Sequence, residues 1–163
     1  MSIPLHTTNA SWSTYRDQFV AALHQLREDG IGDIVFGDID LKSHREWEEQ
    51  VCEEASMCAH LPLWQRNRRD VLRQVWSAGI RCHIVAIDTT RLSEEVLGAE
   101  LTPDLATAFM ETGVDACGEN GEFHTVVVDA PFFRHPIDLV FGEIVSRGGY
   151  QAIDARLSVG PMS

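Results

Sequence analysis

The sequence predicts an α/β fold, on three observations. The chain has 163 residues, enough for one domain with a substantial hydrophobic core. Predicted strands and helices alternate along its first part, an order that implies right-handed crossovers between parallel strands. Residues 33–38 (DIVFGD) form a continuous β-branched and aromatic run, which is typical of a strand covered on both faces of a parallel sheet.

The N-terminal part is predicted to hold a helix, a strand and a second helix. Residues 14–29 form the first helix, because their apolar side chains recur at three- and four-residue steps. Ser13 is its predicted N-cap, and Gly30 ends it. The strand at 33–38 comes next, and a helix at 43–57 follows. The inward stripe of that second helix consists of Trp47, Val51 and Ala55.

The middle of the chain continues the alternation. A third helix is predicted at 69–78 and a strand at 82–87, followed by a short helical segment at 92–97. Thr102 is the predicted N-cap of the next helix, which begins with Pro103. Proline is favoured at this position because the first helical N–H has no partner within the helix.

The last part of the chain has a different pattern. A strand leaves a polar loop at 118–125 and continues to Asp129. Residues 150–159 alternate apolar and polar side chains, as a half-buried strand does, and their apolar members are Ile153, Ala155, Leu157 and Val159. We therefore predict a parallel-sheet domain over residues 1–100 and a small C-terminal α+β lobe over residues 101–163.

Charge and hydropathy argue against two classes of partner. The net charge of −12 disfavours a broad nucleic-acid surface, which needs clustered Lys and Arg. For the one basic group, a solvated helix start is favoured over a nucleic-acid patch; its members are Arg66, Arg68, Arg69 and Arg73. No run reaches the roughly 20 apolar residues that span a bilayer. Residues 1–9 lack a signal-peptide pattern, so we expect a cytoplasmic protein without a membrane partner.

The cysteines do not form a familiar metal motif. None of Cys52, Cys58, Cys82 and Cys117 belongs to a C-x-x-C pair. In a cytoplasmic protein they are expected to be buried small hydrophobes or free thiols. A zinc site from Cys52, Cys58 and His60 is the alternative, but its spacing fits no common zinc pattern. We therefore predict no metal site.

Residues 118–125 (GENGEFHT) concentrate the reactive groups of the chain. The reactive side chains there are those of Glu119, Asn120, Glu122, His124 and Thr125. Gly118 and Gly121 interrupt them, and glycine allows positive φ and close approach of a ligand. Two interpretations remain open on these residues alone. The loop is a functional site held by a rigid strand, or it is a tight turn whose polar groups face water.

Several motifs occur together in the order of a known family. They are Gly37-Asp38, His44-Arg45-Glu46-Trp47, Leu61-Pro62-Leu63-Trp64, residues 113–125 (GVDACGENGEFHT) and Pro131-Phe132. Together they resemble the diphthine–ammonia ligase (diphthamide synthetase) family, an ATP-pyrophosphatase type, and more narrowly its bacterial branch. The resemblance covers roughly residues 1–140. Residues 118–125 are its most specific part.

The resemblance implies a fold and a reaction. The fold is a HUP-type (Rossmann-like) α/β domain, related to adenine-nucleotide α-hydrolases, with a smaller C-terminal lobe. The reaction is ATP-dependent amide formation, in which a carboxylate is adenylylated, pyrophosphate leaves and ammonia attacks the acyl-adenylate. In archaea and eukaryotes the carboxylate belongs to the diphthine side chain of elongation factor 2. The implied cofactors are ATP and Mg²⁺, and the implied partners are ammonia and a small-molecule or protein carboxylate.

Residue roles follow from the resemblance together with the side-chain chemistry. The catalytic candidates are Glu119, Glu122 and His124. Either glutamate accepts a proton from ammonium or from the tetrahedral intermediate, if burial or mutual repulsion raises its pKa. Alternatively, the pair binds a cationic part of the substrate, such as a trimethylammonium group. In an alternating strand Glu122 and His124 share one face, and Phe123 lies on the other. The substrate-binding candidates are Gly118, Asn120, Gly121, Thr125, Arg45 and Trp64, and the nucleotide-binding candidates are Gly37 and Asp38.

One motif of the family does not occur in the sequence. The glycine-rich Ser-Gly-Gly-Lys-Asp-Ser loop that holds ATP phosphates is absent, so we expect an N-terminally truncated HUP domain. Three hypotheses follow. The chain is an ATP-dependent amide ligase, a non-catalytic binding homologue without the phosphate loop, or an interaction domain that forms homo-oligomers through an uncovered sheet edge.

Overall fold

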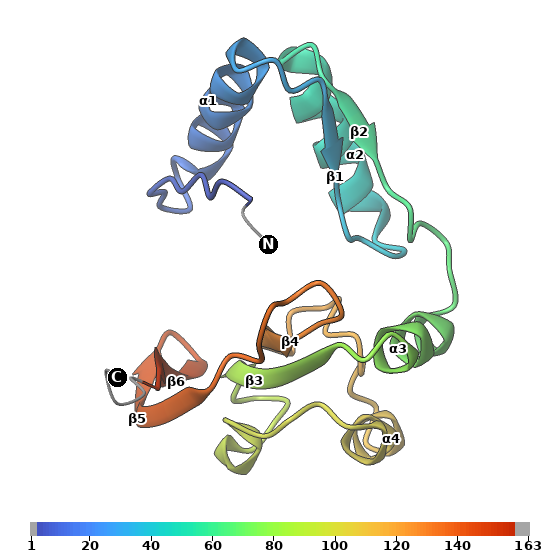
Figure 1. The fold of residues 1–163 in the computed structure, drawn as a ribbon, viewed down its shortest axis with the longest axis vertical. Coiled ribbons are helices and arrows are strands. Elements are labelled where there is room, and N and C mark those ends of the chain that lie inside the picture. The colour runs from blue at the N-terminus through green and yellow to red at the C-terminus, as the bar shows by residue number, and fades with distance from the viewer. Residues whose placement is uncertain (1–2, 159–163) are drawn as a thin grey trace. The chain divides into compact units, whose positions relative to one another are not determined.

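The protein consists of two units, each with its own hydrophobic core (Figure 1). The computed structural model describes residues 3–158. Contacts divide the chain into Ser2–Asn67 and Arg68–Ser163, called here the N-terminal and C-terminal units. The predicted boundary between residues 100 and 101 lies inside the C-terminal unit. No helix within residues 3–158 is both long enough and apolar enough to cross a bilayer.

The N-terminal unit combines two helices with a pair of parallel strands. Its elements are α1 (Tyr15–Glu28), β1 (Asp33–Val35), α2 (Lys42–Glu54) and β2 (Cys58–His60). Ile34 of β1 lies opposite Ala59 of β2 in a parallel register. The structure confirms both predicted helices. It also contains a parallel pair of strands, but the partner of β1 is β2 and not the strand predicted at 82–87. It adds β2, a strand too short to give a pattern in the sequence.

The core of the N-terminal unit lies between the apolar faces of its two helices. Val20 and Leu23 of α1 pack with Val51 and Cys52 of α2, because residues three or four apart share one face of a helix. Ile34 of β1 packs against this cluster. The next residue in β1, Val35, is exposed, since successive strand side chains point to opposite faces. The expectation of a strand covered on both faces is therefore wrong for β1, as the structure describes it.

Over its described residues, 68–158, the C-terminal unit contains one antiparallel sheet, with two α-helices and a short 3₁₀ helix. Its elements are α3 (Arg68–Ser77), β3 (Arg81–Asp88), the 3₁₀ helix η1 (Glu94–Val96), α4 (Pro103–Glu111), β4 (Phe123–Asp129), β5 (Leu139–Arg147) and β6 (Tyr150–Leu157). The strand order is β4-β3-β6-β5. The sequence predicted β3 as a parallel strand of the first domain. The structure corrects this, because β3 pairs antiparallel with β4 and β6, which come from the end of the chain. Val159, the last member of the predicted alternation, lies outside the described residues.

A bulge in β3 brings two of its side chains into the core of the C-terminal unit. Ile84 and Ile87 are both fully buried, although a regular strand would place them on opposite faces. The register against β4 shifts between Ile84 and Ala86, and such a bulge brings both side chains to the same face. Phe109 of α4 packs in this cluster, and so does Phe123 at the start of β4. The loop between α4 and β4 is thus attached to the core at both ends.

Candidate functional site

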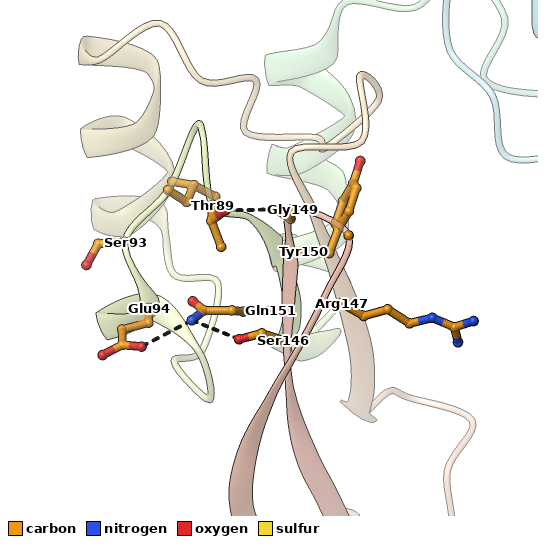
Figure 2. A pocket seen from close by; sticks show the side chains of 10 residues that line it. Thr89, Ser93, Glu94, Ser146, Arg147, Gly149, Tyr150 and Gln151 are labelled. Atoms are coloured by element: carbon orange, nitrogen blue, oxygen red, sulfur yellow. Dashed lines mark hydrogen bonds between the residues drawn. The ribbon is translucent and has the colours of Figure 1, made fainter.

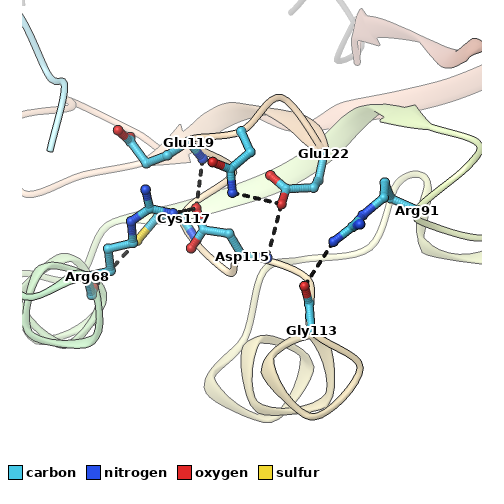
Figure 3. Close-up of polar contacts among 8 residues, drawn as sticks. Arg68, Arg91, Gly113, Asp115, Cys117, Glu119 and Glu122 are labelled. Atoms are coloured by element: carbon cyan, nitrogen blue, oxygen red, sulfur yellow. Dashed lines mark hydrogen bonds and ion pairs between the residues drawn. The ribbon is translucent and has the colours of Figure 1, made fainter. Parts of the chain in front are cut away.

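Asp115 organises the loop between α4 and β4 (Figure 3). Its Oδ1 accepts a hydrogen bond from the backbone N–H of Cys117 at 3.1 Å, and its Oδ2 accepts one from the backbone N–H of Glu119 at 2.9 Å. The guanidinium of Arg68, at the start of α3, lies 2.6 Å from Oδ2. One carboxylate therefore fixes the backbone of the loop and ties it to a neighbouring helix.

Two glycines give the loop its course. Gly118 has φ of +70° and Gly121 has φ of +80°, a region that other residues enter only with strain. A Cβ on Gly118 would also lie 3.1 Å from the carbonyl oxygen of Phe123. The loop therefore needs glycine at position 118 both for its conformation and for the close approach of the backbone.

Glu122 is the most deeply buried polar group in the loop, with 3% of its surface exposed. Its Oε1 accepts hydrogen bonds from the backbone N–H of Asp115 at 3.3 Å and from Asn120 Nδ2 at 3.1 Å. Its Oε2 is also buried but has no hydrogen-bond partner within the described part of the chain. Figure 3 shows the contact between Asp115 and Glu122, and Asn120 donates to the same oxygen of Glu122. The loop therefore supplies hydrogen bonds to Oε1, whereas Oε2 can accept one from a further donor.

The loop keeps Glu122 ionised. Burial by itself would raise the pKa of Glu122, but hydrogen bonds from the Asn120 side chain and from backbone N–H groups outweigh it and lower that pKa. A proton acceptor for ammonium would need a raised pKa, as the sequence-based hypothesis assumed. The direction found here favours the alternative, in which the carboxylate binds a cation.

The strand after Glu122 does not follow the predicted alternation. Phe123 is buried next to Glu122, whereas His124 and Thr125 are exposed. Glu122 precedes β4 and is part of the turn, so the strand period does not apply to it. The expected face shared by Glu122 and His124 is therefore not observed. Glu119 is half-buried, and its backbone N–H is used by Asp115.

The remaining predicted site residues lie in the N-terminal unit and form two contacts. The guanidinium carbon of Arg45 lies 5.0 Å from the centroid of the Trp64 ring, a cation–π arrangement. Asp38 Oδ1 lies 2.8 Å from Nδ1 of His44. Gly37 follows β1, and a Cβ there would meet no atom within 4 Å. No steric reason for glycine exists at that position.

Sequence reasoning missed the residues that hold the loop in place. Asp115 accepts from the backbone N–H groups of Cys117 and Glu119, two and four residues further along the chain. This spacing is typical of a turn that an Asp side chain stabilises. Arg91 also supports the loop, with Nη2 donating to the carbonyl of Gly113 at 2.9 Å. Arg68 and Arg73 of the predicted basic group pair with Asp115 and Asp70, which supports the reading of that group as a helix start.

A cavity of about 520 Å³ lies beside the β5–β6 hairpin (Figure 2). Its polar lining includes Gln151, whose Nε2 lies 3.4 Å from both Glu94 Oε2 and Ser146 Oγ. Thr89, which also lines the cavity, donates to the carbonyl of Gly149 at 2.8 Å. The hydroxyl of Tyr150, another lining residue, lies 3.5 Å from the carbonyl oxygen of Gly121. The cavity is therefore adjacent to the Asp115 loop.

The cysteines and metal-type side chains form no joint site in the described residues. Cys52 and Cys82 are buried and Cys58 is exposed, all as free thiols. Burial raises the pKa of both buried thiols. His60 of the rejected zinc alternative lies 2.7 Å from Asp33 Oδ1. Within residues 3–158, no three His, Cys, Asp or Glu side chains are placed to hold one metal ion.

Fold and loop together define a mixed α/β protein whose antiparallel lobe carries a glycine-punctuated carboxylate site. Comparison with known proteins gives the family. Residues 67–159, more than half of the chain, match the family described as the diphthamide synthase C-terminal domain. The chain therefore belongs to this family.

Curated relatives show the same relationship. The chain is 33% identical over 101 residues to the human diphthine–ammonia ligase, covering 60% of this chain and 38% of that protein. The enzyme of the same name from Schizosaccharomyces pombe is 29% identical over 100 residues, covering 60% of this chain and 16% of the relative. The diphthine–ammonia ligase of Saccharomyces cerevisiae is 29% identical over 130 residues, covering 68% of this chain and 19% of the relative. The chain thus spans well under half the length of these relatives.

Proposed function

We propose that the chain is part of an ATP-dependent ligase that converts a carboxylate into an amide with ammonia. The observation that carries this proposal is that the family match over residues 67–159 contains the whole loop around Asp115 and Glu122. The matched relatives are named diphthine–ammonia ligases. A protein that bears diphthine is accordingly the proposed carboxylate substrate.

Each residue of the loop has a separate role in this proposed reaction. Asp115 and Arg68 hold the backbone so that Glu122 faces the substrate side with a fixed negative charge. His124 is exposed one residue into β4, and imidazole is the side chain that exchanges protons most readily near neutral pH. We assign the acceptance of a proton from ammonium to His124, and the binding of a cation to Glu122.

We propose that the N-terminal unit binds one end of a nucleotide. We propose that it belongs to a HUP-type domain, in which ligands bind beyond the carboxyl ends of parallel strands. Gly37 and Asp38 follow β1 at such an end, and the Asp38 carboxylate suits a ribose hydroxyl donor. The residues present do not fit the phosphates of ATP, because the chain has no glycine-rich loop with converging N–H groups. We therefore assign no residue of this chain to the phosphates or to Mg²⁺.

Release of pyrophosphate tests the proposal. The chain is incubated with ATP, Mg²⁺, ammonium and a diphthine-bearing protein, alone and together with the polypeptide encoded directly upstream. We expect AMP and pyrophosphate in equal amounts, and only when ammonium and the carboxylate are both present. If neither mixture releases pyrophosphate, the assignment as a ligase is wrong.

Binding without turnover is the second candidate function. The ionised carboxylate of Glu122 favours it, because such a group binds a cation without taking part in proton transfer. Calorimetry of this chain with ATP and with AMP separates the two functions. Micromolar binding of ATP by the chain alone contradicts the second candidate, and binding of the diphthine-bearing protein without AMP formation in either mixture supports it.

A further inference from the structure

The open oxygen of Glu122 requires a partner. Buried carboxylate oxygens in folded proteins are nearly always hydrogen-bonded, because leaving one unpaired forfeits its solvation. Glu122 Oε2 is buried without a hydrogen-bond partner among the residues described here. The nearby guanidinium of Arg68 is paired with Asp115, and that of Arg91 with the Gly113 carbonyl. Neither of these two guanidinium groups donates a hydrogen bond to Oε2.

The ligand for this oxygen must be small, cationic and rich in hydrogen-bond donors. Small size follows because Glu122 is only 3% exposed. A cation is favoured because the bonds from Asp115 and Asn120 already stabilise the ionised form. Donor N–H groups are favoured over a bare ion because the remaining oxygen is a single acceptor, too few ligands for a metal ion that prefers several oxygens.

We propose that Glu122 Oε2 binds the ammonium ion that supplies the amide nitrogen. Ammonium is about the size of a water molecule and carries N–H donors, one of which Oε2 can accept, while the Asn120 side chain donates to the other oxygen. A trimethylammonium group, the other cation considered for this loop, has no N–H to donate, and its methyl groups keep its charge away from a buried oxygen. This inference rests on the proposed function and specifies where its nitrogen donor binds.

Nuclear magnetic resonance of the full chain tests the site without ATP or turnover. The reporters are the two N–H groups that bind Glu122, the backbone amide of Asp115 and the side-chain amide of Asn120. Ammonium chloride is titrated into nitrogen-15-labelled protein at constant ionic strength, against potassium chloride and tetramethylammonium chloride. We expect both reporters to shift and saturate with ammonium and to remain unchanged with the other two salts.

Glu122→Gln is the matching variant, because it keeps the shape and one acceptor oxygen but removes the charge. We expect ammonium binding to weaken about tenfold to a hundredfold, since hydrogen bonds to charged groups are the stronger ones. Glu111→Gln removes one negative charge at the exposed end of α4, and we expect it to bind ammonium as the unchanged chain does.

Three outcomes overturn the inference. They are equal reporter shifts with all three salts, no shift with ammonium, and a Glu122→Gln variant that binds ammonium normally. The wild-type comparison of salts needs no variant, so a folding defect in Glu122→Gln leaves the test intact. Absence of pyrophosphate release with normal ammonium binding would refute the proposed function while leaving this site in place.

Discussion

The Asp115 carboxylate lies 2.6 Å from the guanidinium of Arg68, and this contact joins the loop after α4 to the first turn of α3. Both side chains are largely shielded from water, with 12% and 25% of their surfaces exposed. Asp115 accepts two backbone N–H groups at the same time. The conformation of the loop around Glu122 therefore depends on Asp115, which lies outside the GENGEFHT motif.

Replacing Asp115 by alanine should release the loop. Asp115→Ala leaves the N–H groups of Cys117 and Glu119 without their acceptor, and a lost partner for a shielded group costs about 1–3 kcal/mol. Native-state hydrogen exchange should show faster exchange at these two amides. Residue-level exchange is the suitable measurement, because two units with separate cores need not unfold in one step.

The control for this prediction is Glu111→Ala, which removes an exposed carboxylate at the end of α4. Its effect on the loop amides should be within experimental error. Unchanged exchange at Cys117 and Glu119 in Asp115→Ala would mean that the loop holds its shape without the carboxylate.

Gly118→Ala should destabilise the C-terminal unit more than Gly113→Ala. Both glycines have positive φ, so both substitutions carry the cost of the left-handed region, about 1–2 kcal/mol. Only at position 118 would the new Cβ also meet a backbone oxygen, at 3.1 Å, whereas at position 113 nothing lies within 4 Å. Urea unfolding of the two variants measures the difference. If both variants lose the same free energy of unfolding, the close approach to Phe123 does not affect stability.

Thr102 should contribute a helix cap to α4. Its side chain accepts from the backbone N–H of Leu105 at 3.2 Å, as the sequence predicted from the Thr-Pro pair. Thr102→Ala should lower stability by about 1 kcal/mol, and Thr102→Ser, which keeps the hydroxyl, should lower it much less. Thermal unfolding monitored by circular dichroism compares them. Indistinguishable alanine and serine variants would contradict the capping role.

Glu122 should make stability depend on acid pH. Its pKa in the folded protein lies below its ordinary value of 4.5, so its stabilising contribution is present above that value. The contribution is lost as the pH falls through the lower, folded pKa. The stability difference between the wild type and Glu122→Gln should therefore be largest near neutral pH and vanish in acid. If the stability difference between the two proteins instead grows as the pH falls, the pKa of Glu122 in the folded protein is not lowered.

The sequence predicted local structure well where the pattern of a single helix decided it, although the N-cap of α1 is Thr14 and not the predicted Ser13. Residues 14–29 and the start at Pro103 match α1 and α4 closely, because apolar periodicity and a capping threonine act within one helix. Local patterns could not predict the strand pairing in the sheet of the C-terminal unit. The pairing of β3 with β6 joins residues far apart in the chain, and no local pattern of Ile84 or Ile87 indicates the bulge.

The candidate site divides in the same way. The glycine requirement at position 118 follows from residue type alone and is confirmed by its positive φ. The pKa direction of Glu122 was not predictable, because it depends on the Asn120 amide and on the N–H of Asp115 converging on one oxygen. The roles of Glu119, His124 and the N-terminal unit residues stay predictions.

Transfer of labelled nitrogen tests the central claim most directly. The chain, with the polypeptide encoded upstream, is given ATP, Mg²⁺, a diphthine-bearing protein and nitrogen-15 ammonium, and the protein product is analysed by mass spectrometry. The account predicts one labelled amide nitrogen per AMP formed, with the yield at limiting ammonium strongly reduced in Glu122→Gln and unchanged in Glu111→Gln. AMP formation without label in the product, or full labelling by Glu122→Gln at limiting ammonium, would contradict it.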